Sequence, residues 1–142
     1  MLTIELVPKT AWFKNLRSEL PRMQWDKLRK ATYSAAGNHC EVCGGKGPKW
    51  PVECHEIWIY DDIKHTQTLT GLIALCPSCH QVKHMGLARI RGKEEEATQH
   101  LMKVNHFNRY EANSFIEKAF ILWEERGKNN WKINYEWVNT VL

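Results

Sequence analysis

The sequence predicts a single α+β domain that is mostly helical and has a short β-hairpin at its centre. The chain has 142 residues, of which 43% are hydrophobic and 25% charged, which is the composition of one soluble globular domain. Apolar residues recur at helical spacing towards both ends, and two short β-rich runs lie in the middle. We expect one domain over residues 1–142, with N-terminal helices (1–37), a central unit (38–92) and a C-terminal helical segment with a tail (93–142).

The N-terminal part predicts two helices. Residues 10–20 place four apolar side chains at helical spacing, namely Trp12, Phe13, Leu16 and Leu20. Pro21 suits the first turn of a second helix, which we expect to run to about residue 36 and to end at Gly37.

The central unit predicts a loop, two strands and a helix. Residues 44–51 are dense in Gly and Pro and predict a tight loop. Residues 52–60 and 69–75 have the composition of strands, and the polar residues 61–68 between them predict the turn of a hairpin. From Ser78 the spacing becomes helical and continues through Gly86.

The last third predicts two helices and a tail. The first helix covers residues 93–104. The second begins at Asn108, with Glu111 as its capping-box partner, and ends at Gly127. The alternating apolar residues in 131–138 predict either a short strand or an extended strap on the core.

Charge and hydropathy indicate the cellular location and the kind of partner that we expect for this protein. No apolar run approaches the ~20 residues that a membrane span needs, and the first residues lack a secretion-signal pattern, so we expect a cytoplasmic protein without membrane contact. The net charge of +4 favours a polyanionic partner weakly. The basic excess lies within residues 1–92.

Four of the five cysteines form two Cys-x-x-Cys pairs, which predict a metal site. Cys40 and Cys43 make the first pair, Cys76 and Cys79 the second, and Cys54 is unmatched. In a reducing compartment, metal binding is a better interpretation than disulfides. Two such pairs complete a tetrahedral four-thiolate site, which for Zn²⁺ leaves no open position and is structural. Buried free thiols or a redox pair are the alternative.

Three histidines predict a second site. His80 and His84 are one helical turn apart, so they share a helix face within reach of one cation. His80 directly follows Cys79, and His55 lies in the first predicted strand. Unrelated histidines scattered over the surface are the alternative interpretation.

Residues 40–84 resemble an HNH nuclease. The two cysteine pairs, Glu53 to Glu56 in the first strand, residues 72–75 in the second, and His80 and His84 carry the resemblance, which covers about a third of the chain. It implies a ββα-metal core, in which two antiparallel strands and a helix hold one catalytic divalent ion (Mg²⁺, Mn²⁺, Ni²⁺ or Zn²⁺) beside the structural Zn²⁺. It also implies an endonuclease, a hydrolase that acts on the phosphodiester bonds of DNA.

The resemblance assigns roles to the histidines in two ways. In the first, His55 is the general base that deprotonates water, His80 and His84 are ligands of the catalytic metal, and Cys54 or a nearby acid completes the metal shell. In the second, His55 is a metal ligand and Glu56 is the base. The first is favoured, because the pKa of histidine suits a general base better.

One position departs from the family pattern. The middle Asn of the family, which helps to orient the base, is replaced here by Gly71. Thr70 and Gln67 are the candidates for taking its place. This departure favours an alternative function, a zinc-stabilised nucleic-acid-binding module with weakened catalysis.

Five basic residues are the candidate contacts to DNA phosphates. They flank the predicted site in the loop and on or after the metal-binding helix: Lys46, Lys49, Lys83, Arg89 and Arg91. A solvated surface explains each of them equally well. Because one such site cuts one strand, a double-strand cutter would need a second copy, so a homodimer is one expectation.

Overall fold

The computed structural model describes residues 1–11 and 15–142. Two long strands, β1 (Glu53–Asp61) and β2 (Thr66–Leu75), form the centre, and the short β3 (Lys132–Asn134) joins them. The helices are α1 (Leu16–Glu19), α2 (Arg22–Ala35), α3 (Pro77–Lys83), α4 (Met85–Ile90), α5 (Glu94–Asn105), α6 (Arg109–Arg126) and the 3₁₀ helix η1 (Glu136–Thr140). The fold is therefore α+β, as predicted.

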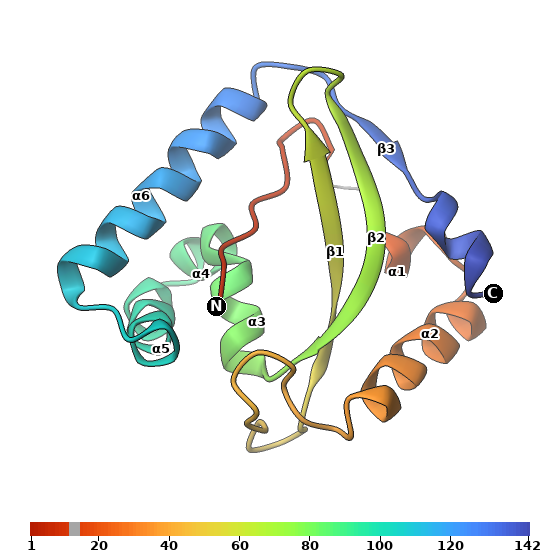
Figure 1. Cartoon of the computed structure of the whole chain (residues 1–142), viewed down its shortest axis with the longest axis horizontal. Helices are drawn as coiled ribbons and strands as arrows, with labels where there is room; N and C mark the ends of the chain where they lie inside the picture. The colour runs from red at the N-terminus through yellow and green to blue at the C-terminus, as the bar shows by residue number, and fades with distance from the viewer. Residues whose placement is uncertain (12–14) are drawn as a thin grey trace.

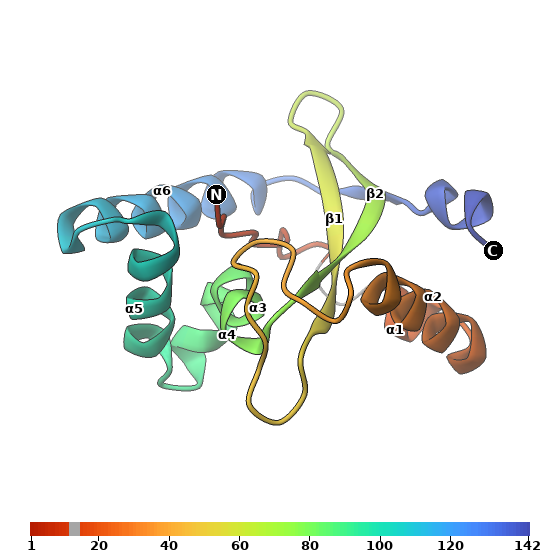
Figure 2. The ribbon, with the colours of Figure 1, turned by 60° about the horizontal axis from the view of Figure 1, so that its bottom comes forward.

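The sheet separates two groups of helices. In Figure 1, α3 to α6 lie on one side of the β1–β2 hairpin, and α1, α2 and η1 lie on the other. Figure 2 shows the tip of the hairpin projecting beyond the helices. β1 pairs with β2 antiparallel, and β3 pairs with β2 parallel. The predicted hairpin is confirmed, and it gains a third strand from the C-terminal tail.

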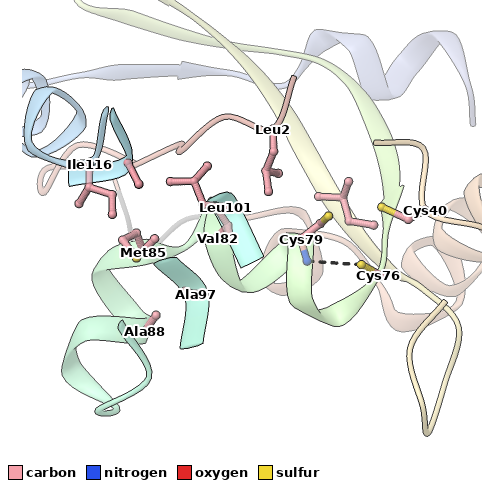
Figure 3. Close-up of a cluster of buried hydrophobic side chains, with 12 residues drawn as sticks. Leu2, Cys40, Cys76, Cys79, Val82, Met85, Ala88, Ala97, Leu101 and Ile116 are labelled. Atoms are coloured by element: carbon pink, nitrogen blue, oxygen red, sulfur yellow. Dashed lines mark hydrogen bonds between the residues drawn. The ribbon is translucent and has the colours of Figure 1, made fainter. Parts of the chain in front are cut away.

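Each side of the sheet has its own hydrophobic core. The core beside α3, α5 and α6 is built around Leu2, Leu75, Val82, Met85 and Leu101 and also contains three of the cysteines (Figure 3). The core beside α1, α2 and η1 contains Leu16, Trp58, Leu69 and Val138. Because successive residues of a strand point to opposite faces, the β2 neighbours Leu72 and Ile73 pack against different cores.

A register shift interrupts the hairpin between Ile57 and Trp58. Ile57 pairs with Gly71, whereas Trp58 pairs with Leu69, so Thr70 is the extra residue of a bulge in β2. The Thr70 hydroxyl donates to the Ile57 carbonyl at 3.2 Å. The bulge lies two residues beyond His55.

The first helix is shorter than predicted. α1 begins at Leu16, because the Asn15 side chain accepts the Ser18 N–H at 2.9 Å and caps the helix there. Residues 10 and 11 lie in a turn, and the predicted positions Trp12 and Phe13 lie outside the described residues. The second helix is confirmed, with Pro21 preceding its first turn, and Gly37 follows it at a φ of +63°.

The predicted helix from Ser78 through Gly86 is two helices. His84 separates α3 from α4 with φ −100° and ψ 51°. The turn that leads to it is intact, since the His84 N–H donates to the His80 carbonyl at 3.2 Å. The two C-terminal helices are confirmed, and Asn108 caps α6 with Glu111 in a capping box.

The first eight residues form an irregular segment, which we call the N-terminal strap. It runs beside the hairpin on the side of α3 and α6 (Figure 1). Leu2 at its start is completely buried. Two hydrogen bonds of 2.8 Å join the Leu2 backbone to the Asn105 amide, and the Trp123 indole donates to the Val7 carbonyl at 3.0 Å.

Among the described residues, no helix combines the length and the apolar character needed to cross a membrane.

Candidate metal centres

The four paired cysteines converge at one end of the hairpin. Cys40 and Cys43 lie in the loop before β1, and Cys76 and Cys79 lie at the junction of β2 and α3. One ligand atom from each lies within 4.8 Å of the others, and the Cys43 and Cys76 sulfur atoms are 3.7 Å apart. This spacing is far beyond an S–S bond, and a metal ion fits between the four sulfur atoms.

The local backbone aims these sulfur atoms inward. The Cys43 N–H donates to the Cys40 sulfur at 3.5 Å, and the Cys79 N–H donates to the Cys76 sulfur at 3.4 Å. Gly44 has a φ of +76°, which glycine adopts without strain. At Gly47 a Cβ atom would lie 2.7 Å from the Pro77 ring, so the loop passes the start of α3 too closely for any other residue.

The electrostatics of the cluster call for a cation. Burial opposes ionisation of Cys40, but backbone N–H donors, that of Cys43 first, lower the pKa of its thiol to about 7. Burial, followed by the charge of Cys40, raises the pKa of Cys79 far above its usual range. Four thiolates therefore cannot form together unless a positive charge lies among them.

A histidine outside the predicted site contacts this cluster. The His100 Nε2 on α5 lies 3.1 Å from the Cys79 sulfur, and burial lowers the pKa of the imidazole. A neutral ring with its proton on Nε2 donates to the thiolate and fixes its direction. No spacing rule in the sequence links residue 100 to the cysteine pairs, so the sequence analysis missed it.

The three predicted histidines also come together. His55 from β1 and His80 and His84 from α3 and its end place one ligand atom each within 4.8 Å of the other two. The ring centres are 4.8 to 5.3 Å apart, with edge-to-face angles of 65° to 72°. His55 is only 5% exposed. We call these three residues the histidine trio.

The protonation of the trio suits metal binding. Burial lowers the pKa of His80, against the opposing effect of Glu53, and lowers that of His84 to about 3. Glu53 accepts a hydrogen bond of 2.9 Å from His80 Nδ1, so the His80 Nε2 carries the lone pair. That atom lies 3.2 Å from the His84 Nε2, a separation that one shared cation would explain.

Two other predicted residues lie away from the trio. Cys54 and Glu56 are the neighbours of His55 in β1 and point to the opposite face of the sheet. The Glu56 carboxylate accepts the Leu16 N–H at 2.8 Å, and burial raises its pKa to about 7. Burial also raises the pKa of the Cys54 thiol to about 12. Neither residue is placed to complete the metal shell.

The positions considered for the missing Asn have other surroundings. Gly71 lies opposite Ile57, and Thr70 is bonded to the Ile57 carbonyl. Gln67 is completely buried, opposite Tyr60 towards the far end of the hairpin. None of the three belongs to the trio or forms a hydrogen bond to His55.

The predicted DNA-binding residues are dispersed. Lys46, Lys49 and Arg91 are exposed. Arg89 is engaged in a bidentate pair with Glu94, at 2.8 and 2.9 Å. Only Lys83 lies close to the trio, at the end of α3, and its ammonium donates to the Thr3 hydroxyl at 2.6 Å.

A groove of about 320 Å³ runs along the N-terminal strap between β1 and α6. Its wall includes Lys83, Arg126, Trp58 and Glu5. Arg126 lies over the Tyr60 ring and pairs with Asp62 at 2.9 Å. The groove thus places cationic and aromatic side chains next to the Glu5 carboxylate.

Glu5 is the second functional candidate that sequence reasoning missed. Its Oε2 lies 2.6 Å from the His55 Nε2. The alternation of Leu2, Ile4 and Leu6 with other residues, a strand-like pattern, indicates an extended segment with Glu5 on the opposite side. The pattern gives no partner for Glu5, since His55 is fifty residues away.

Comparison of the chain with protein-family models, with curated proteins and with solved structures gives no match.

Proposed function

We propose that this protein is a metal-dependent endonuclease with a ββα-metal core, in which the histidine trio holds a divalent cation. The observation that carries the proposal is the convergence of His55, His80 and His84 from one strand–strand–helix unit. The core in this proposal is β1, β2 and α3. This is the arrangement that the resemblance to HNH nucleases implies.

The donor set fits a divalent transition metal. Three imidazole donors without thiolates suit Zn²⁺ or Ni²⁺ better than Ca²⁺. Three protein ligands are also the usual number in a catalytic site that keeps a position open. When bound, such a cation supplies positive charge beside a phosphodiester and promotes ionisation of a water molecule.

In this proposal His55 is a third ligand rather than the general base. Its ring lies within 5.3 Å of both other rings, and its burial leaves little room for bulk water. This reverses the role favoured from the sequence. Glu56, the base in the alternative assignment, points away from the trio and is not proposed as a catalytic residue.

The cysteine cluster is proposed to hold a structural Zn²⁺. Four sulfur donors fill a tetrahedral shell and leave no position for a substrate. Cys79 and His80 are consecutive, so a metal at the cysteines would fix the start of α3 and with it the direction of the His80 ring. In this way one metal site supports the geometry of the other.

DNA is the proposed substrate. Lys83, which precedes His84 and lines the groove, supplies a positive charge next to the trio, and Lys46, Lys49 and Arg91 add exposed positive charge on the same central unit. Contacts of this kind hold phosphates without selecting a sequence. The affinity for DNA should therefore fall steeply as the salt concentration rises.

Plasmid cleavage tests the proposal. The zinc-loaded protein should nick supercoiled DNA when Mn²⁺, Ni²⁺ or Mg²⁺ is added, and His84→Ala should lower the rate at least a hundredfold. His106→Asn is the matched control, because His106 is exposed and has a φ of +56° that asparagine tolerates. Equal rates for wild type and His84→Ala would refute the proposal.

A metal-binding measurement separates the two roles of His55. If His55 is a ligand, His55→Ala loses both cleavage and affinity for the second cation. If it is the base, His55→Ala loses cleavage and retains the cation.

A second candidate function is a nucleic-acid-binding module without catalysis. Gly71 at the position of the family Asn favours it, and neither Thr70 nor Gln67 forms a hydrogen bond to His55 in its place. This candidate predicts salt-dependent DNA binding with no cleavage under any divalent ion. Cleavage that chelation abolishes and added metal restores would exclude it.

A further inference from the structure

The N-terminal strap delivers one charged side chain to the histidine trio. The strap is fixed on α3, because the Glu5 N–H donates to the Lys83 carbonyl at 3.1 Å and the Lys83 ammonium donates to Thr3. The Glu5 side chain turns towards β1 and is only 16% exposed. The position of this carboxylate is therefore set by the contacts of Thr3 and Glu5 with the end of α3.

Both oxygen atoms of Glu5 contact β1. Oε2 lies 2.6 Å from the His55 Nε2, and Oε1 accepts the Trp58 N–H at 3.3 Å. A carboxylate only accepts hydrogen bonds when ionised, so the His55 Nε2 carries the proton. The lone pair of the His55 ring then belongs to Nδ1.

The same arrangement occurs at a second member of the trio. Glu53 accepts from His80 Nδ1 with one oxygen and from the Trp50 indole with the other, at 2.9 and 2.8 Å. Two of the three histidines thus have one ring nitrogen bonded to a carboxylate, which leaves the other nitrogen as the candidate metal ligand. Carboxylate–histidine pairs of this kind fix the tautomer and orientation of metal ligands.

We propose that Glu5 is a positioning residue of the histidine trio, and that docking of the N-terminal strap and binding of the cation stabilise each other. The proposal rests on the trio being the metal site of the proposed function, and it does not depend on cleavage. By linkage, a cation that prefers the docked strap must also strengthen that docking.

Cation affinity tests the positioning role. Protein with Zn²⁺ in the cysteine site is titrated with Ni²⁺ by calorimetry, so that only the second site is filled. Glu5→Ala should weaken Ni²⁺ binding 10- to 100-fold, and Glu5→Gln, which keeps an acceptor oxygen, should weaken it less. Glu96→Gln is the control, an exposed carboxylate on α5, and should bind as wild type does.

Amide exchange tests the coupling to the strap. The Leu2 and Glu5 amides are bonded to Asn105 and to the Lys83 carbonyl, so their exchange rates report docking. Ni²⁺ should slow both amides in wild type and in Glu96→Gln, and should leave them unchanged in Glu5→Ala. Glu53→Gln should weaken Ni²⁺ binding, and at saturating Ni²⁺ it should still protect the strap.

A second variant covers the case in which Glu5→Ala does not fold. Asn105→Ala loosens the strap at Leu2 and leaves the Glu5 carboxylate in the sequence, and it should weaken Ni²⁺ binding severalfold. Unchanged Ni²⁺ affinity in the folded Glu5 variants, or in Asn105→Ala if those do not fold, overturns the proposal, even if thermal stability falls. Wild-type protein that binds no second cation overturns it too, whereas binding without DNA cleavage refutes only the nuclease.

Discussion

At the scale of single residues, two adjacent residues of β1, His55 and Glu56, lie in different environments on opposite faces of the sheet. His55 faces α3 and joins the trio, whereas Glu56 faces α1 and is enclosed among apolar residues of the second core. The alternation of a strand explains why two adjacent polar residues cannot share one site here. Sequence spacing alone left both residues as candidates.

The raised pKa of Glu56 makes stability depend on pH. Burial raises the pKa of the folded state to about 7 from a reference of 4.5, so between these values the folded state holds a proton that the unfolded state has lost. The contribution of Glu56 to stability is fully present below pH 4.5 and is lost, by about 3 kcal/mol, as the pH rises through 7. Glu56→Gln should remove this loss.

Urea unfolding checks this prediction. Glu56→Gln should be more stable than wild type at pH 8, by up to about 3 kcal/mol, and nearly equal to it at pH 4.5. Glu19→Gln, on the exposed side of α1, should differ from wild type equally at both values. A Glu56→Gln protein that is no more stable at pH 8 would show that Glu56 ionises without penalty.

At the scale of elements, caps decide where the helices begin. Asn15 and Asn108 each close a capping box, at the starts of α1 and α6. The cap at Asn108 was predicted from its spacing to Glu111. The cap at Asn15 was not, because the apolar residues before it continue the helical spacing and conceal the boundary.

The Asn108 cap should contribute measurably to stability. Its amide oxygen accepts the Glu111 N–H at 2.8 Å, and the Glu111 carboxylate accepts the Asn108 N–H at 2.9 Å. Asn108→Ala removes one of these bonds and should lower the free energy of unfolding by about 1 kcal/mol. Asn113→Ala, exposed within the same helix, should change it by less than about 0.5 kcal/mol in thermal or urea unfolding.

At the scale of the whole molecule, the cysteine cluster belongs to a hydrophobic core. Cys40, Cys76 and Cys79 are at most 5% exposed and pack with Leu2 and Leu75. Removing a bound metal would leave thiols inside this core, or thiolates, whose burial without a counter-charge costs more free energy. The folding of the central unit should therefore depend on whether the cysteine cluster holds a metal ion.

Chelation should unfold this unit. The purified protein should contain one tightly held Zn²⁺, and a strong chelator at neutral pH should abolish the cooperative thermal transition, because metal binding and folding are coupled in such sites. Cys79→Ser should reproduce the effect, whereas Cys54→Ser, outside the cluster, should keep the metal. A chelated protein that melts as the loaded one does would refute a structural metal.

Local patterns predicted much of this molecule, and long-range contacts account for the rest. The hairpin, α5, α6 and both ligand sets follow from periodicity, caps and spacing within a few tens of residues. Glu5, His100 and the parallel pairing of β3 depend on contacts between residues far apart, which leave no local pattern. The break at His84 was missed because the helical spacing of His80, His84 and Leu87 continues through it.

The strap has a consequence for the order in which the parts of the protein are completed during synthesis. All four cysteines of the cluster lie within the first 79 residues, so the cluster can close on a partial chain. The strap cannot complete its contacts at that stage. Leu2 contacts Asn105, which is 103 residues later, and Val7 contacts Trp123, which is 116 residues later. A ribosome-bound chain without α5 and α6 could close the cysteine cluster and would still lack these two anchors of the strap, so that only the contacts of Thr3 and Glu5 with Lys83 would hold Glu5 beside His55.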